Sequence, residues 1–330
     1  MATPRVLIFG TGSLGIVLGA FLHRSGADIV CVCRSNYETA NKHGLRTDST
    51  AFRNYTYYPK IVQSLSESRQ VPGPPYEYVV VCTKAFLDEE PSPAELIKEI
   101  IISDKTSIVL VQNGIGVEDP YQERFPDNLV ISCVAYMPST RVSPTEVVQT
   151  ETQRILMGAF PSRVLSREEG DKLQYFADML RAGGAQAEIH SDIQVERWKK
   201  LVGNATWNPI CSLSRCRDLE LLGSCDIAGS FVKAAMREVV AVAQTLGYGA
   251  EVNEDVVRSQ IQRSVVRAPP GVQPSMMADM LRGSKMEVEA IVGEVVKMAR
   301  KNGVSVPRLE TLYVLGSGLN WRISQSGEDS

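Results

Sequence analysis

Short β-rich runs of apolar residues alternate with amphipathic stretches through the first 190 residues of the chain. The runs at 6–9, 28–33, 78–82 and 106–111 are rich in Val, Ile and Leu, which is typical of strands buried on both faces of a parallel sheet. We predict helices at amphipathic stretches such as 91–102 and 167–182, which separate runs of this kind. Because parallel neighbours need a crossover connection, the alternation predicts a doubly wound α/β sheet.

The pattern changes near residue 192, after which apolar residues recur at helical spacing to the C-terminus. We predict helices at 195–207, 227–246, 253–263, 275–281, 284–301 and 307–319. Pro209 predicts that the first of these helices ends or bends at Asn208, because a proline disfavours helical geometry in the residue before it. The second half of the chain is therefore predicted to be all-α.

A glycine motif, Gly10-x-Gly12-x-x-Gly15, directly follows the first predicted strand and opens a helical pattern. In this context the first glycine permits a tight turn, the second lets backbone approach a pyrophosphate, and the third lets the helix lie close to the sheet. The helix N-terminus adds free N–H groups and a partial positive charge. We predict a dinucleotide site here, the alternative being a glycine-rich turn without a ligand. The predicted binding loop is Gly10, Thr11, Gly12, Ser13, Leu14 and Gly15.

Arg34 follows the second predicted strand, where NAD enzymes usually carry an acidic residue that binds the ribose 2′-hydroxyl. A guanidinium instead suits a 2′-phosphate, because its planar fork of donors matches phosphate oxygens. The sequence therefore predicts NADPH as the cofactor. The alternative is a solvated surface arginine.

These observations predict two domains, a Rossmann-type NADP-binding domain over residues 1–190 and an all-α substrate and catalytic domain over residues 191–330. In doubly wound sheets, ligands bind beyond the carboxyl ends of the strands. Lys84 and Asn113 each follow a predicted strand. We expect the active site in the cleft between the domains.

Lys200, Asn204 and Asn208 lie four residues apart and would share one face of a helix. Amides are poor helix formers and poor core residues, so two of them on the face of a lysine indicate a polar substrate. The alternative is a solvent-facing stripe with a surface lysine.

Two serines, Ser275 and Ser284, stand at the starts of later predicted helices. Ser275 is placed to cap the helix at 275–281, and Ser284-x-x-Glu287 is a capping-box pattern. From spacing alone, a helix cap and a functional role are equal alternatives for Glu287.

Charge and composition narrow the class of protein. The net charge is −3 with no long basic run, which argues against nucleic acid or an anionic membrane as partner. No apolar run approaches the roughly 18 residues of a transmembrane helix, and the first strand begins too early to leave room for a targeting peptide. The seven cysteines show no zinc or redox spacing, so we expect reduced thiols, no metal and a cytoplasmic location.

Taken together, the separated motifs resemble those of the ketopantoate reductase (2-dehydropantoate 2-reductase) family over essentially the whole chain. The matching pieces are Gly10-x-Gly12-x-x-Gly15 with Arg34, Lys84, Gln112-Asn113-Gly114, Trp198-x-Lys200-x-x-x-Asn204-x-x-x-Asn208-Pro209, Pro274-Ser275-Met276 and Glu287-x-Glu289. The resemblance implies NADPH-dependent reduction of ketopantoate to pantoate, in pantothenate and coenzyme A biosynthesis.

The resemblance also implies roles for single residues. Lys200 would donate a proton to the developing alkoxide, and Glu287 would touch the cofactor or hold the lysine. A positioned ammonium beside a carboxylate can serve as a general acid, which agrees with this role. The substrate would contact Asn113, Asn204, Asn208 and Ser275, and the cofactor would also contact Lys84, Asn113 and Glu287.

Some residues depart from the family pattern and bear on the substrate more than on the reaction. Asp218 stands roughly where the family often has a further substrate-side asparagine. The alternatives are a paralogue that reduces another 2-oxo acid or a lactone, a 3-hydroxy acid dehydrogenase, and a non-catalytic NADPH-sensing module. We expect a small-molecule 2-oxo acid as the partner, and we consider that the chain forms a homodimer.

Overall fold

A computed structural model of the chain describes residues 3–328 and divides it into two compact units. The first unit comprises Met1–Lys84, Glu89–Gln112 and Glu118–Ile193. The second, helical unit comprises Ala85–Asp88, Asn113–Val117 and Gln194–Ser330. Two short loops from the first half of the sequence therefore belong to the helical unit.

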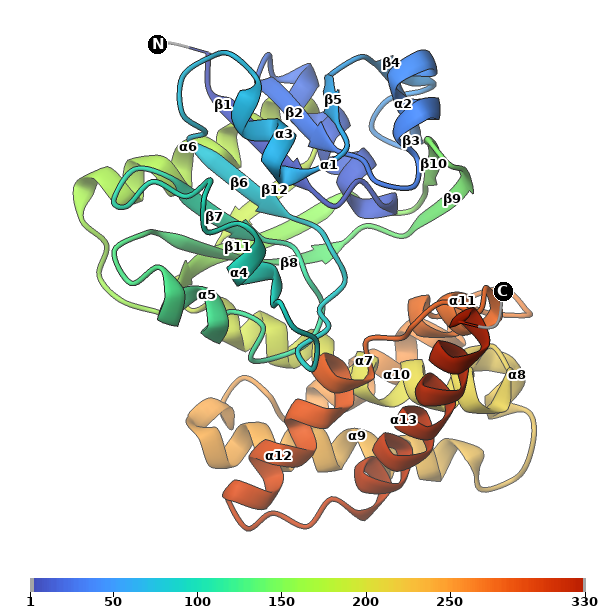
Figure 1. The fold of residues 1–330 in the computed structure, drawn as a ribbon. Helices are drawn as coiled ribbons and strands as arrows, with labels where there is room; N and C mark the ends of the chain where they lie inside the picture. The colour runs from blue at the N-terminus through green and yellow to red at the C-terminus, as the bar shows by residue number, and fades with distance from the viewer. Residues whose placement is uncertain (1–2, 329–330) are drawn as a thin grey trace. The chain divides into compact units, whose positions relative to one another are not determined.

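The first unit is built on an eight-stranded sheet in the order β12-β11-β8-β7-β6-β1-β2-β5 (Figure 1). Within this sheet, the neighbouring strands of the described chain run parallel, except β8 and β11, which run antiparallel. The predicted doubly wound sheet is thus confirmed, with one antiparallel pair. The strands are β1 (Arg5–Phe9), β2 (Asp28–Val32), β5 (Lys60–Val62), β6 (Tyr78–Val81), β7 (Ser107–Leu110), β8 (Val130–Tyr136), β11 (Arg154–Phe160) and β12 (Gln186–Ile189).

Both faces of this sheet are buried, which explains the unbroken apolar strands. Alternate residues of β1 point to opposite faces, as the period of a strand requires. Val6 and Ile8 pack with α1 (Ser13–Arg24) and α6 (Arg167–Gly183). The residues between and after them, Leu7 and Phe9, pack in a separate core on the other face. That second core includes residues of α4 (Pro93–Leu96) and α5 (Asp119–Arg124), with α3 (Leu65–Gln70) at its edge.

A second sheet of four strands, in the order β4-β3-β10-β9, also packs against α1. Its strands are β3 (Leu45–Ser49), β4 (Tyr55–Tyr57), β9 (Ser139–Ser143) and β10 (Glu146–Gln149), and α2 (Tyr37–His43) precedes β3. The Tyr57 hydroxyl donates to the carbonyl of Ile16 at 2.7 Å and joins this sheet to α1. The small sheet also brings β9 into contact with α1.

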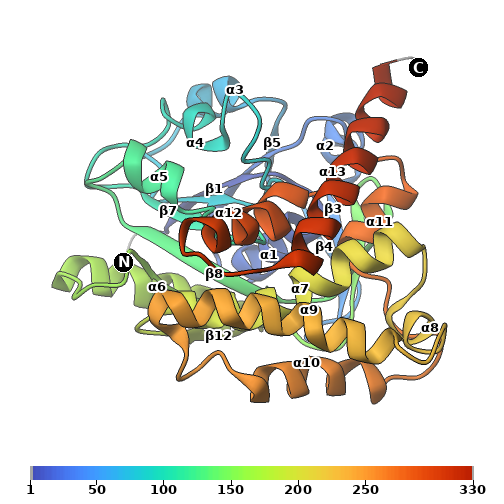
Figure 2. The ribbon, with the colours of Figure 1, turned by 90° about the horizontal axis from the view of Figure 1, so that it is seen from below.

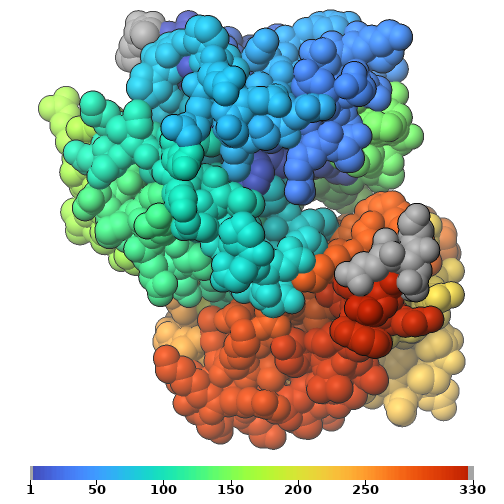
Figure 3. Space-filling view, in the orientation of Figure 1, coloured from blue at the N-terminus to red at the C-terminus, as the bar shows by residue number. Residues whose placement is uncertain are grey.

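The helical unit contains no strand among its described residues, which confirms the predicted all-α second half. Its helices are α7 (Ile193–Ser214), α8 (Asp218–Leu222), α9 (Ala228–Ala243), α10 (Glu254–Val265), α11 (Ser275–Leu281), α12 (Glu294–Lys301) and α13 (Pro307–Glu328), with π-helical turns at Gln244–Tyr248 and Glu289–Gly293. Helices α9 and α10 lie side by side (Figure 2). Helices α12 and α13 also pack together and reach the surface of this unit (Figure 3).

Two predicted helix boundaries are wrong. The helix predicted at 91–102 is only the short α4, and residues 97–102 lie outside it. In contrast, α7 does not end at Asn208 but runs through Pro209 to Ser214. Ile210 and Cys211, just beyond the proline, are buried in the core of the helical unit, so packing outweighs the local preference.

None of the helices in residues 3–328 combines the length and the apolar character needed to cross a membrane.

Candidate functional site

The glycine loop after β1 has the local geometry that a phosphate site needs. Gly10 has a φ of +101°, and a Cβ there would lie 2.6 Å from the backbone nitrogen of Thr83. A Cβ on Gly15 would lie 2.1 Å from the carbonyl oxygen of Gly10, so the helix can approach only without a side chain. A Cβ on Gly12 would meet nothing within 4 Å. Gly12 is therefore free of packing demands and leaves open space beside the loop.

The first turn of α1 offers donors to an anion. The earliest amide bonded within this region is that of Ile16, which donates to the carbonyl of Gly12 at 3.0 Å. The N–H groups of residues 13–15 are therefore not used by the helix itself. The first turn carries no acidic residue. These features, with the open space at Gly12, fit the phosphates of a dinucleotide.

Basic side chains flank this loop on the same unit. The Thr11 hydroxyl donates to the carbonyl of Val32 at 2.6 Å and ties the loop to the end of β2, just before the exposed Arg34. Arg141 on β9 donates through Nη2 to the carbonyl of Thr11 at 3.2 Å. Sequence reasoning missed Arg141, because 130 residues separate it from the loop it contacts.

Lys84 is exposed at the carboxyl end of β6, on the same edge of the sheet as the glycine loop. The Gln112 amide, at the end of β7, donates to the carbonyl of Thr83 at 3.1 Å and holds the turn that carries the lysine. The chain passes from β1 to β2 on one side, whereas β6 lies on the other, so this edge is a topological switch point. Ligands bind at such points in open α/β sheets.

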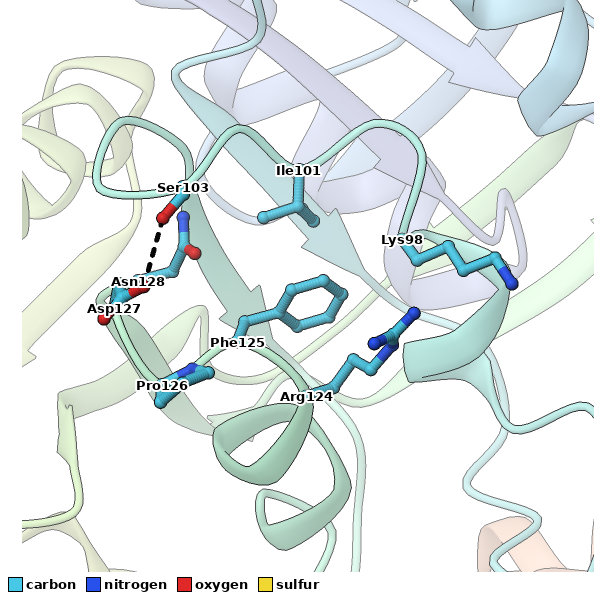
Figure 4. A pocket seen from close by; sticks show the side chains of 8 residues that line it. All are labelled: Lys98, Ile101, Ser103, Arg124, Phe125, Pro126, Asp127 and Asn128. Carbon is cyan, nitrogen blue, oxygen red and sulfur yellow. Dashed lines mark hydrogen bonds between the residues drawn. The ribbon is translucent and has the colours of Figure 1, made fainter.

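A surface pocket lies at the opposite edge, before β7 and β8 (Figure 4). The ring of Phe125 points toward its centre, and Ser103 bonds to Asp127 at 3.2 Å. Both of its cations pair with one carboxylate, that of Glu95. The pocket contains none of the predicted site residues and has little free charge for a ligand. Its lining is Lys98, Ile101, Ser103, Arg124, Phe125, Pro126, Asp127 and Asn128.

Among the described residues, no group of three or more His, Cys, Asp or Glu side chains is arranged to hold a metal ion.

The helical unit holds Lys200 in a defined environment. Its side chain is half-buried on α7, and Nζ donates to Oδ1 of Asn113 at 2.8 Å. Burial lowers the pKa of Lys200 from 10.5 to about 8, and the nearby charge of Arg197 acts in the same direction. The carboxylate of Glu287 opposes both effects and raises the pKa. The structure thus brings together three predicted site residues: Lys200, Asn113 and Glu287.

The loop that carries Asn113 is fixed to this unit by a π-helical turn. The N–H of Glu294 reaches back to the carbonyl of Glu289, one residue further than in an α-helix. The carbonyl of Ala290 accepts instead from the N–H of Ile115, at 3.0 Å. Gly114 has a φ of +104°, and a Cβ there would lie 2.4 Å from the same carbonyl oxygen. Only glycine therefore fits at this contact.

Glu287 does not cap the helix that the sequence predicted at 284–301. Residues 284–287 lie outside any helix, which begins at Val288, and the N–H of Ser284 donates to the carbonyl of Asp279. The Glu287 side chain is 4% exposed, and its Oε1 accepts from the N–H of Ala85 at 2.9 Å. Of the two alternatives for Glu287, the capping box is therefore not formed, and the carboxylate binds the backbone of the 85–88 loop instead.

The remaining predicted substrate residues differ in their surroundings. Asn204 is half-buried one turn after Lys200. Asn208 is 3% exposed, and its Nδ2 has no hydrogen-bond partner within the described chain. A buried donor without a partner costs about 1–3 kcal/mol, which a polar ligand would offset. Ser275 is exposed at the first position of α11 and does not cap it, since the preceding Pro274 takes the cap position.

Asp218 has a structural role in the loop before α11. The side chain is 3% exposed, and its Oδ1 accepts from the N–H groups of Leu219 at 2.9 Å and Val272 at 2.6 Å. Both bonds are to backbone of the helical unit. The carboxylate is thus engaged in holding the 272 region, which leads into Ser275.

Two family models match most of the chain. The model described as "Ketopantoate reductase PanE/ApbA" matches residues 6–162, and the model described as "Ketopantoate reductase PanE/ApbA C terminal" matches residues 192–320. A protein from Nostoc sp. named 2-dehydropantoate 2-reductase is 27% identical over 313 residues, which cover 95% of this chain and 94% of that protein.

Solved structures show the same architecture. The crystal structure of 2-dehydropantoate 2-reductase from Methylococcus capsulatus superposes with a TM-score of 0.82 at 31% identity, covering 97% of this chain and 98% of that chain. A ternary structure of D-mandelate dehydrogenase with NADH and anilino(oxo)acetate superposes with a TM-score of 0.81 at 21% identity, covering 97% and 99%. The second likeness concerns the fold alone.

Proposed function

Since the chain belongs to the ketopantoate reductase family and is an oxidoreductase of the pyridine-nucleotide-dependent type, we propose that it uses NADPH to reduce a 2-oxo acid. We further propose that this acid is ketopantoate, which becomes pantoate for pantothenate and coenzyme A. The observation that carries the proposal is the half-buried ammonium of Lys200, held by Asn113. The remaining site residues act around it.

NADPH, when bound, would supply the hydride. The glycine loop and the first turn of α1 would hold its pyrophosphate, because the space at Gly12 is open and the first-turn amides face no acidic residue. Arg34 would bind the 2′-phosphate, since it is exposed directly after β2. Lys84 would contact the cofactor from the end of β6, on the same edge of the sheet.

Lys200 would donate a proton to the oxygen of the ketone as that oxygen becomes negative. With a pKa of about 8, the ammonium is mostly charged at neutral pH and still gives up its proton readily. The Asn113 carbonyl orients the ammonium, and the Glu287 carboxylate stabilises its charge. Asn204, Asn208 and Ser275 would bind the hydroxyl and carboxylate groups of the substrate. The unpartnered Nδ2 of Asn208 supports its part in this.

The test is NADPH oxidation, followed by absorbance, with ketopantoate and a panel of other 2-oxo acids. We expect the highest kcat/KM with ketopantoate. Lys200→Ala should lower kcat by about 10²–10⁴, the usual worth of a positioned acid, with NADPH affinity little changed. Lys199→Ala is the matched control, because Lys199 pairs with Glu196 rather than with Asn113. Near-normal turnover of the Lys200 variant would exclude the proposed role.

A paralogue that acts on another 2-oxo acid or a lactone is the second candidate. Asp218 favours it, because this carboxylate stands roughly where the family often has an asparagine and bonds to backbone instead. A higher kcat/KM for another member of the panel would select this candidate. NADPH binding without turnover of any 2-oxo acid would instead indicate a sensing module.

All seven cysteines are free thiols, which supports a reducing cytoplasmic location. Gel filtration would test whether the protein forms a homodimer.

A further inference from the structure

Arg197 is a buried arginine one helical turn before Lys200. Its exposed fraction is 3%, although arginine is rarely buried without a structural or functional reason. Nη1 donates to the carbonyl of Gly114 at 3.0 Å. The adjacent residue, Asn113, accepts the hydrogen bond from Lys200 at 2.8 Å. Two side chains on one face of α7 thus hold neighbouring residues of one loop.

We propose that Arg197 is a positioning residue, which fixes the Asn113–Val117 loop so that Asn113 orients the ammonium of Lys200. The inference rests on the role proposed above for Lys200. On its other side the loop meets the π-helical turn, through the Ile115 N–H bond to Ala290 and the close contact at Gly114. Without Arg197, the loop would lose the side-chain hydrogen bond that holds its backbone at the residue next to Asn113.

The charge of Arg197 has a separate effect on the same lysine. Burial is the largest cause that lowers the pKa of Lys200, and Arg197 is the second. A variant without this charge should therefore hold the lysine proton to higher pH. The groups that face the ammonium are Asn113 from the loop, Arg197 from α7, Glu287 from the segment before the π-helical turn, and Arg263 from α10.

Two substitutions separate the hydrogen bond from the charge. Arg197→Met removes both, whereas Arg197→Lys keeps the charge but loses the planar fork that reaches Gly114. The measurement is kcat as a function of pH, from about pH 6 to about pH 10, a range that brackets the pKa of the acid. Activity that needs a protonated lysine falls as pH rises through its pKa.

We expect the low-pH plateau of kcat to fall about tenfold or more in both variants, because misplacement by an ångström can cost about 10² in rate. The alkaline limb should move to higher pH in Arg197→Met and stay near its normal position in Arg197→Lys. Lys199→Met is the matched control, since it removes a charge from the position next to Lys200, and Lys199 pairs with Glu196. A normal plateau and limb in Arg197→Met, or the same limb shift in the control, would overturn the proposal.

Gly114→Ala tests the loop from its other side and is available if Arg197→Met fails to fold. The new Cβ would press on the Ala290 carbonyl while the arginine charge stays in place. The plateau should fall with the limb unmoved, and a normal plateau would contradict the proposed positioning.

A readout without turnover separates this inference from the proposed function. Reductive ¹³C-methylation labels the lysines for NMR titration, and the Lys200 signal is identified by its loss in Lys200→Met. Its titration should move to higher pH in Arg197→Met, and an unmoved titration counts against the inference. If the unmodified protein reduces no 2-oxo acid, the proposed function fails, while this titration still tests whether Arg197 acts on Lys200.

Discussion

Replacing Lys200 with methionine should stabilise the folded protein at neutral pH while removing most of its activity. The pKa of Lys200 is lowered from 10.5 to about 8, chiefly by burial. Between these two values the folded protein binds fewer protons than the unfolded chain, so stability rises with pH across this window. The cost of charging the buried lysine is fully present below about pH 8 and disappears above about pH 10.5. At about 1.4 kcal/mol per pH unit, a shift from 10.5 to about 8 makes this cost about 3.5 kcal/mol.

Methionine carries no charge and retains much of the packing of the lysine stem. It loses the hydrogen bond to Asn113, which offsets part of the gain. A bond to a charged group contributes about 1.5–3 kcal/mol, so we expect a net stabilisation on the order of 1 kcal/mol. For 330 residues the entropy of unfolding is about 0.7 kcal/mol/K, so the expected rise in Tm is about 1–2 °C.

The assay is thermal unfolding of both proteins without cofactor, at about pH 7 and at about pH 10. Between these two values Lys200 of the folded protein loses its proton. The methionine variant should melt higher at neutral pH, and the difference should shrink at alkaline pH. Its kcat should fall by about 10²–10⁴. Lys199→Met controls for the loss of a positive charge on α7. A lower Tm of the Lys200 variant at neutral pH, or a difference that is the same at both pH values, would refute the reasoning.

Four further predictions concern the site. Arg34→Ala should weaken NADPH binding by about 1.5–3 kcal/mol and barely change NADH binding, as measured by fluorescence titration; equal losses would refute the cofactor assignment. Gly12→Ala should leave Tm unchanged, because the new Cβ meets open space in the protein. It should weaken NADPH binding about tenfold or more, because the Cβ would occupy the space proposed for the pyrophosphate. An unchanged affinity for NADPH would show that the glycine loop does not bind the cofactor. Glu287→Gln should shift the alkaline limb of kcat to lower pH, because the lost carboxylate no longer raises the pKa of Lys200; a limb that stays in place would contradict this. Asn208→Leu should raise KM for the substrate without lowering Tm, since the buried Nδ2 has no partner in the described chain; a large fall in Tm with a normal KM would indicate a structural amide.

The sequence was most informative where one local rule decides the structure. The glycine motif is such a case, because its demands fall on single residues: Gly10 has a positive φ, and neither Gly10 nor Gly15 has room for a Cβ. The spacing of Lys200 and Asn204 likewise places them one turn apart on α7. Asn208 follows on the same helix only because the core around Ile210 carries α7 through the proline, and no local preference indicates that outcome.

Contacts between residues that lie far apart in the sequence could not be predicted from the sequence alone. Glu287 matches a capping box in its spacing, yet its carboxylate bonds to Ala85, 202 positions earlier. Arg197 resembles any charged residue of an amphipathic helix until its contact with Gly114 is known. The partner in each case lies in a loop that follows a strand, and the distance in sequence carries no signal of the pairing.

The division of the chain places Lys200 and its hydrogen-bond partner in the same compact unit. The helical unit includes Asn113–Val117 and Ala85–Asp88, so the bonds from Lys200 to Asn113 and from Ala85 to Glu287 both lie within one compact unit. These loops continue directly from the segments that carry Gln112 and Lys84 in the first unit. The contacts of Lys200 with Asn113 and of Glu287 with Ala85 are therefore set inside the helical unit. The π-helical turn completes this arrangement, since its altered bonding lets the Ala290 carbonyl bind the loop backbone.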